Sequence, residues 1–153
     1  MTARPAHNAD RRSDVFALRT RVEISDTDLG GVVYYGRYSH MLDRAVIAYR
    51  RHIGIAPLGP EGHLFVVRRV EMDYLISARF EDELDIAVWI PRIGRSSHTV
   101  ACEITHVVTG GVLLRAEYTI VGVSGYDGGR PTRVPHQMTD AIVAHEGDSV
   151  QRR

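Results

Sequence analysis

The chain has 153 residues, with 44% hydrophobic and 25% charged, which is typical of one globular domain and unlike disordered or membrane-spanning chains. Lys plus Arg equal Asp plus Glu at 19 each, so the net charge gives no reason to expect attraction to nucleic acid or to an anionic membrane surface. No run of residues has the apolar length of a signal peptide or a membrane span. We expect mobile polar tails at residues 1–13 and 146–153 around a single domain at 14–145.

The first predicted elements are a strand and a long helix. Apolar and polar side chains alternate from Val15 to Ser25, which predicts a strand, and the turn-forming run DTDLGG follows it. Apolar residues then recur at helical spacing from Gly36 to His52, which predicts an amphipathic helix with a polar outer face. Gly54 is expected to end this helix in the left-handed conformation.

The second half of the chain has the pattern of β-structure. Strands are expected at 64–76, 84–90, 99–104 and 112–123, joined by turns, with Pro91 marking a strand end or a sheet edge. Successive strands with short connections predict an antiparallel meander, whose apolar face the long helix should cover. The fold class is therefore α+β, with a short terminal helix at 136–145.

The segment with the clearest chemistry is the loop before the predicted helix, which contains Asp26 and Asp28. A helix N-terminus presents unpaired N–H groups and a positive dipole end, which stabilise negative charge on a carbonyl oxygen. A nearby carboxylate can attack the carbonyl carbon or activate water, so this segment holds both parts that acyl transfer needs. The alternative is that both aspartates only form turns and cap nearby N–H groups.

The run VEISDTDLGGVVYYGRYSHMLDRA resembles the signature of the 4-hydroxybenzoyl-CoA thioesterase family of hot-dog-fold proteins, which includes thioesterases associated with the Tol-Pal system. The resemblance rests on an Asp-Thr-Asp-x-x-Gly-x-Val-Tyr pattern, followed by a further tyrosine and an acidic residue in the helix. It continues in VEMDYLISARFEDELDI and RIGRSS, and so spans roughly Val15 to Val123.

The resemblance implies a hot-dog fold, in which an antiparallel sheet wraps around a long central helix, and assembly into a homodimer or homotetramer with active sites between subunits. It implies hydrolysis of an acyl-CoA or acyl-carrier-protein thioester without metal or other cofactor. By position, Asp28 matches the catalytic carboxylate, and Asp26 matches a neighbour with a structural role. The backbone N–H at Tyr35, with Gly36 beside it, matches the group that polarises the thioester carbonyl.

Further site residues follow from the same resemblance. Asp43 falls where many members carry a longer glutamate facing the site, and an exposed helix carboxylate is the alternative. Arg92, Arg95 and Ser96 match a turn that contacts the nucleotide end of CoA, where arginine binds phosphate through its planar fork. Solvated arginines are the alternative there. Val66 is expected to line the acyl pocket.

The sequence leaves several other functions open. A hot-dog scaffold could bind an acyl thioester or a protein without turnover, and the acyl group could be aromatic, short to medium in length, or a polyketide. A hydratase on this fold is disfavoured, because such enzymes pair Asp with His in a different motif that His40 does not reproduce. The histidines lack metal-ligand spacing, so surface or packing roles are expected. Cys102, the single cysteine, fits core packing and a cytoplasmic location.

Overall fold

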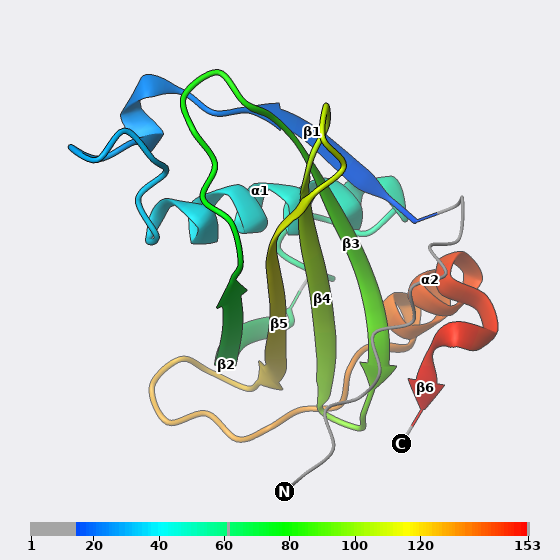
Figure 1. The fold of residues 1–153 in the computed structure, drawn as a ribbon. Helices are drawn as coiled ribbons and strands as arrows, with labels where there is room; N and C mark the ends of the chain where they lie inside the picture. Colours follow the sequence, from blue (N-terminus) through cyan, green and yellow to red (C-terminus); the bar gives the residue numbers. More distant parts are fainter. Residues whose placement is uncertain (1–14, 61, 153) are drawn as a thin grey trace, which may run out of the picture.

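The structure is a computed structural model that describes residues 15–60 and 62–152. In chain order its elements are β1 (Ala17–Arg21), η1 (Ile24–Asp26), α1 (Arg37–His52), β2 (Leu64–Tyr74), β3 (Glu83–Ile93), β4 (Ser97–His106), β5 (Val112–Val123), α2 (His136–Glu146), η2 (Gly147–Ser149) and β6 (Gln151–Arg152). The class is α+β, as the sequence predicts: one curved, mainly antiparallel sheet bends around α1, and α2 packs beside β3 (Figure 1). The expected N-terminal tail at 1–13 lies outside the described residues.

The six-stranded sheet has the order β1-β3-β4-β5-β2, with β6 pairing to β3. The predicted meander holds for β3, β4 and β5, but it is wrong for β2, which pairs with β5 and not with β3. The cause is the connection 75–82, which is bound to the segment before α1. Ala78 accepts a hydrogen bond from the Val33 N–H at 2.8 Å and donates one to the Tyr38 hydroxyl at 3.0 Å. The chain therefore crosses to the other side of the sheet before β3 begins.

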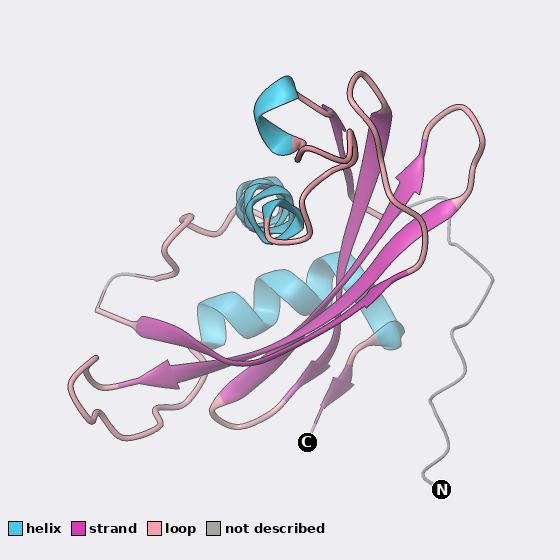
Figure 2. Cartoon of the chain, turned by 60° about the vertical axis from the view of Figure 1, so that its left-hand side comes forward, coloured by secondary structure: helices cyan, strands magenta, loops and turns pink. Residues whose placement is uncertain are grey.

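Helix α1 crosses the concave face of the sheet, so the expected packing of helix on sheet is confirmed (Figure 2). Its buried residues recur at the predicted spacing: Tyr38, Met41, Leu42, Ala45 and Tyr49. Gly54 has φ of 79° and its N–H donates to the Arg51 carbonyl at 3.1 Å, which confirms the predicted helix end. The opposing core residues are Leu84, Ile86 and Val88 of β3, Val100, Cys102 and Ile104 of β4, and Leu114, Tyr118 and Ile120 of β5.

The first strand is shorter than predicted. It ends at Arg21, and Ile24, expected on its apolar face, is 68% exposed within η1. The Asp26 carboxylate accepts a hydrogen bond from the Glu23 N–H at 2.9 Å, and the Thr27 N–H bonds to the Ile24 carbonyl at 3.2 Å. These local hydrogen bonds take the place of hydrogen bonds to a neighbouring strand, so the chain leaves the sheet and turns toward α1.

The strand β3 continues through Pro91 to Ile93, so the expected strand end is wrong, and β3 is an inner strand between β1 and β4, with Pro91 in the gap between its partners β1 and β6. β1 covers β3 only as far as Ala87, and the ladder to β4 is irregular between Trp89 and Arg92. Proline, which has no N–H to donate, is tolerated at such a place. None of the helices in the described ranges is long and apolar enough to cross a membrane.

The C-terminal elements are joined to the sheet and to α1 by hydrogen bonds. One carboxylate oxygen of Glu146, at the end of α2, accepts the Tyr49 hydroxyl at 2.6 Å and the Ile90 N–H at 3.1 Å. After the expected domain boundary at residue 145, the chain continues through η2, and Gln151 of β6 pairs with Arg92. The structure thus adds a short strand where the sequence pattern predicts only a polar tail.

His98 is the most buried polar side chain of the core, with 1% exposure, which fits the packing role expected for the histidines. Its ring meets the Phe65 ring edge-on at 5.8 Å, and neither ring nitrogen has a hydrogen-bond partner in the described part of the chain. Burial, together with the positive charge of nearby Arg50, lowers the pKa of His98 to about 3. The native imidazole is therefore neutral at pH 7.

This burial predicts a loss of stability in acid. In the unfolded chain a histidine has a pKa of about 6.5, so His98 becomes protonated there below that pH. In the native chain it stays neutral down to about pH 3. The free energy of unfolding should fall as pH drops through this window, by up to roughly 1 kcal/mol per unit. Urea titrations between about pH 5 and pH 7 should show a flatter slope for His98→Leu. His136→Gln, at an exposed site, should keep the wild-type slope, and an unchanged slope in His98→Leu would contradict the assignment.

Candidate active site

The loop between η1 and α1 is held by its own hydrogen bonds. The Asp28 N–H donates to the Val32 carbonyl at 2.9 Å, and the Gly31 N–H donates to the Asp28 carbonyl at 3.0 Å. Thr27 and Val33 form an isolated bridge, and Gly31 has φ of 74°, a conformation that glycine adopts without strain. Asp28 thus lies in a tight turn and not on a free segment.

The Asp28 side chain is exposed in the single chain and is only partly used by the turn. Its Oδ1 accepts the Gly30 N–H at 2.7 Å, which is the turn-forming role weighed as the alternative to catalysis. Its Oδ2 has no hydrogen-bond partner among the residues that the structure describes. One oxygen therefore fixes the carboxylate, and the other is available to a ligand.

Asp26 has the structural role expected for it. Its carboxylate bonds the Glu23 N–H and lies 3.4 Å from the Arg37 Nε, and its carbonyl accepts the Tyr34 N–H at 2.9 Å. These contacts connect η1 to the first turn of α1. They also place the Asp28 turn at a fixed position relative to the helix.

The helix start presents unused donors. The Tyr34 and Arg37 N–H groups are bonded, whereas the N–H groups of Tyr35 and Gly36 have no acceptor in residues 15–60 and 62–152. Gly36 is the N-cap without a side-chain cap, and the first turn carries no acidic residue that would offset the positive dipole end. The arrangement suits a carbonyl oxygen that gains negative charge.

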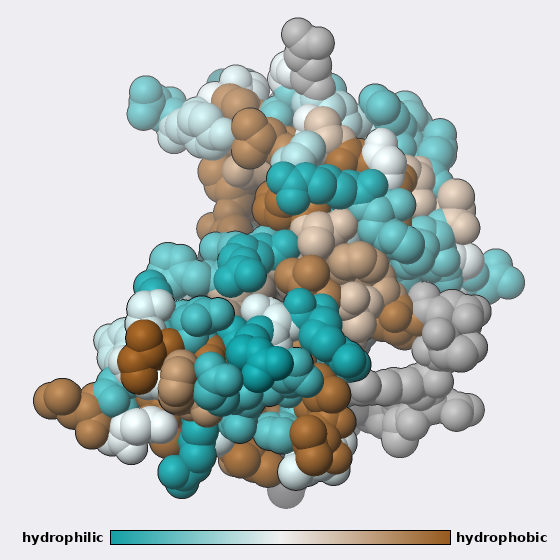
Figure 3. Space-filling view, turned by 90° about the horizontal axis from the view of Figure 1, so that it is seen from above, coloured by the Kyte–Doolittle hydropathy of each residue, from teal (hydrophilic) through white to brown (hydrophobic). Residues whose placement is uncertain are grey.

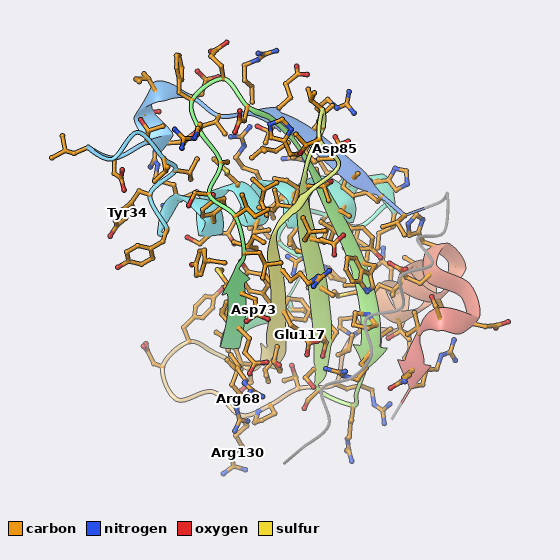
Figure 4. The ribbon with its side chains drawn as sticks, viewed as in Figure 1. Tyr34, Arg68, Asp73, Asp85, Glu117 and Arg130 are labelled. Atoms are coloured by element: carbon orange, nitrogen blue, oxygen red, sulfur yellow. The ribbon has the colours of Figure 1, made fainter. Side chains whose placement is uncertain are left out.

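An aromatic cluster covers this helix start. The Tyr34 and Tyr35 rings lie 4.6 Å apart, Tyr74 meets Tyr35 at 6.4 Å and Tyr38 at 5.8 Å, and Tyr34 reaches the surface (Figure 4). A Cβ on Gly36 would lie 2.8 Å from the Tyr34 ring, so glycine allows this close packing. Sequence reasoning missed Tyr74, although an aromatic residue at a predicted strand end was a visible signal.

Asp43 lies on α1 and is exposed in the single chain, so the surface alternative has support. It still acts on the sheet electrostatically. Burial, and secondarily the Asp43 charge, raise the pKa of the Cys102 thiol to about 12. The pKa of the Tyr118 hydroxyl is also raised, mainly by burial, with smaller effects from Cys102 and Asp43.

The residues expected to bind CoA are not brought to Asp28 within one chain. The β3–β4 turn lies at the end of the sheet opposite to the connection 75–82 (Figure 1). Arg92 binds the Glu117 carboxylate at 2.5 Å, and Figure 4 places Glu117 well apart from Tyr34 at the helix start. The backbone carbonyls of Arg95 and Ser96 accept N–H groups from Val134 at 2.8 Å and Gly122 at 2.9 Å, respectively.

Val66 is half-buried on β2 and pairs with Val121 near the start of that strand, whereas Tyr74 ends it beside α1. Asp28, Tyr35 and Gly36 thus lie on the one loop that leads into α1, whereas Arg92, Arg95, Ser96 and Val66 lie on other strands and turns of the sheet. Within residues 15–60 and 62–152, no three His, Cys, Asp or Glu side chains are grouped so as to hold a metal ion.

A model of the thioesterase superfamily matches residues 30–112, which is more than half of the chain. The chain belongs to the thioesterase superfamily. The acyl-CoA thioesterase YbgC of Haemophilus influenzae is 33% identical over 81 residues, covering 51% of this chain and 60% of the relative. The acyl-CoA thioester hydrolase YbgC of Escherichia coli O157:H7 is 38% identical over 74 residues, covering 47% and 55%. The matches thus span somewhat more than half the length of these curated relatives.

Solved structures agree with the family. A probable thioesterase from Bartonella henselae has a TM-score of 0.68 and 28% identity, covering 80% of this chain and 99% of the other. A variant of 4-hydroxybenzoyl CoA thioesterase complexed with 4-hydroxybenzoyl CoA has a TM-score of 0.76 and 20% identity, covering 85% and 99%. The hot-dog fold predicted from the sequence is confirmed.

The hydrogen bond between Tyr38 and Ala78 predicts a stability effect beside the site. The Tyr38 hydroxyl is buried and accepts the Ala78 N–H, so Tyr38→Phe leaves that N–H without a partner. The free energy of unfolding should fall by about 1–3 kcal/mol, measured by urea denaturation. Tyr126→Phe, at an exposed position, is the matched control and should change stability little. Equal stability of the two variants would show that Ala78 does not depend on Tyr38.

Proposed function

We propose that this protein is an acyl-CoA thioesterase, which hydrolyses an acyl thioester to the free acid and CoA. The observation that carries the proposal is the Asp28 turn leading into a helix start with unused Tyr35 and Gly36 N–H groups. The names of the YbgC relatives from Haemophilus influenzae and Escherichia coli support the same activity.

In the proposed mechanism, the thioester carbonyl oxygen accepts hydrogen bonds from the N–H groups of Tyr35 and Gly36. The Asp28 Oδ2 attacks the carbonyl carbon, the C–S bond breaks, and the sulfur leaves as the CoA thiolate. Water then hydrolyses the mixed anhydride and restores the carboxylate. In the second route, Asp28 takes a proton from water, which attacks the same carbon. Both routes consume one water and need no metal or redox cofactor.

The helix start contributes by stabilising the oxyanion. The positive end of α1 is not offset by an acidic side chain in its first turn, so its electrostatic effect on a developing negative charge is kept. We assign Asp43, on α1, to the acyl side of the site, because it holds the position at which the resembled family carries a glutamate that faces the site. There it would orient water or the acyl group.

The acyl group is aromatic or of short to medium length in this proposal. The 4-hydroxybenzoyl CoA complex among the structural neighbours supports an aromatic group for this fold, and the YbgC names leave the group open. A thioester carried on an acyl carrier protein, including a polyketide, is the second candidate substrate. A hot-dog module that binds an acyl thioester without turnover is the candidate from another class.

We also propose that the active form is a homodimer or homotetramer. Arg92, Arg95, Ser96 and Val66 lie at the far end of the sheet from Asp28, so a second copy is needed to bring them to its substrate. The edge strand β2 and its neighbours expose the apolar residues Tyr34, Tyr35, Val67, Val70, Tyr74, Leu75, Ile76 and Phe80. Figure 3 views the molecule from the top of Figure 1, and there hydrophobic residues reach the surface among hydrophilic ones. An edge strand flanked by apolar side chains suits pairing with another copy.

A cytoplasmic location belongs to the same proposal. It is supported by the free, buried thiol of Cys102, which suits a reducing compartment.

Replacing Asp28 by Asn tests the activity. The amide keeps a side-chain oxygen that can accept the Gly30 N–H, but it lacks the charge needed for attack or proton removal. The rate of thiol release from acyl-CoA should fall by roughly 10²- to 10⁴-fold, with the same circular dichroism and oligomeric state as wild type. Asp127→Asn, at an exposed turn, is the matched control and should keep full activity.

The assay is best run on a panel of aromatic, short-chain, medium-chain and carrier-protein thioesters with thiol detection. Full activity of Asp28→Asn would refute the catalytic assignment. Tight binding across the panel without released thiol would favour the non-catalytic module.

The proposed assembly can be tested by introducing a negative charge among the exposed apolar residues beside β2. Leu75→Glu and Ile76→Glu should each shift the mass measured by light scattering from dimer or tetramer toward monomer, because a buried unpaired carboxylate is costly. The rate of thiol release should fall in each variant whose measured mass falls. Val108→Glu, at an 82% exposed apolar residue of the β4–β5 turn, should leave both unchanged. A monomeric wild-type protein with full activity would contradict the proposed shared site.

A further inference from the structure

The last residue of β2, Tyr74, reaches the start of α1. Its hydroxyl lies 3.4 Å from the carbonyl oxygen of Tyr35 and 3.4 Å from the sulfur of Met72. A phenol has one proton to donate, and a peptide carbonyl is a stronger acceptor than a thioether. The hydroxyl therefore donates to Tyr35, across the gap between the sheet edge and the helix.

This contact determines the direction of a backbone N–H. The Tyr35 carbonyl and the Gly36 N–H belong to one planar peptide unit, in which the C=O and N–H bonds point in opposite directions. Holding the carbonyl oxygen toward Tyr74 therefore points the Gly36 N–H away from Tyr74. That N–H has no acceptor among the described residues, so it stays available to a ligand.

The peptide unit between Tyr35 and Gly36 needs such a restraint because one of its two residues is a glycine. Gly36 lacks a Cβ, so rotating the preceding peptide unit meets little steric resistance. Gly36 also has no side-chain cap, and Tyr34 and Tyr35 before it are exposed. Without a partner for the Tyr35 carbonyl, the peptide could turn over and present an oxygen where the site needs a donor.

The phenol of Tyr74 is itself held in place. Its ring meets the Tyr35 ring nearly perpendicularly, at 89°, and packs against the Tyr38 ring at 61°. Tyr38 is bound in turn to the Ala78 N–H of the connection that follows β2. The aromatic cluster therefore fixes the hydroxyl relative to both the sheet and the helix.

We propose that Tyr74 is a positioning residue, whose hydroxyl holds the Tyr35–Gly36 peptide so that the Gly36 N–H faces the reacting carbonyl. The inference rests on the proposed thioesterase function, and it adds a side chain from the sheet to an oxyanion site otherwise built from one loop. Because the N–H acts on charge that develops during reaction, losing its orientation should affect turnover more than substrate binding.

Tyr74→Phe tests the proposal, since it removes the hydroxyl and keeps the ring. With the best acyl-CoA of the panel, kcat should fall by roughly tenfold, with KM and the mass in solution unchanged. Tyr126→Phe is the matched control, because it removes a hydroxyl from an exposed tyrosine outside the cluster and outside the proposed interface, and its kcat should stay at the wild-type value. An unchanged kcat in Tyr74→Phe would overturn the proposal. So would a raised KM with unchanged kcat, or a loss of assembly together with activity, because these would give Tyr74 a binding or interface role.

A second measurement does not depend on catalysis. The Gly36 amide resonance in ¹⁵N spectra should shift and broaden in Tyr74→Phe and stay sharp in Tyr126→Phe, because only the first variant loses the restraint. An identical Gly36 resonance in all three proteins would overturn the positioning role. If wild type releases no thiol from any substrate, the proposed function fails, and this spectrum still decides whether Tyr74 orients the peptide.

Discussion

The two hydrogen bonds at Ala78 are the constraint on which the rest of the site depends. Ala78 accepts the Val33 N–H and donates to the Tyr38 hydroxyl, so the connection after β2 is joined to the loop before α1 and to the helix itself. The same connection takes the chain from one edge of the sheet toward the other, which puts β2 beside β5. Sheet order, helix placement and the geometry of the Asp28 loop are therefore coupled.

Much of the fold follows from local pattern. The period of apolar residues from Tyr38 to Tyr49 and the glycine at position 54 define α1 closely, because each acts within one or two helical turns. The strands are likewise visible from alternation. The pairing of β2 with β5 was not predictable in this way, since it depends on bonds from Ala78 to residues some forty positions earlier. The early end of β1 also escaped the pattern, because the side-chain bond from Asp26 outweighs the alternation that continues through Ile24.

The site divides along similar lines. Asp28, Tyr35 and Gly36 come from one short segment, so a sequence motif places them together, and the structure keeps them together. Arg92, Arg95, Ser96 and Val66 come from other strands and turns, so their distance from Asp28 depends on the sheet topology, which a local motif does not encode. Tyr74 belongs to neither group by sequence. It reaches the helix start only because β2 ends there, which alternation along a strand does not reveal.

The environment of Cys102 has a practical consequence for anyone who handles this protein. Its thiol lies within the sheet–helix core, and burial with the Asp43 charge raises its pKa to about 12, so it stays protonated at neutral pH. Disulfide reagents that detect free thiols react with thiolates, so the native protein should add almost no background of its own in such an assay. The same chemistry should spare the protein from oxidation and cross-linking during storage in air without reductant.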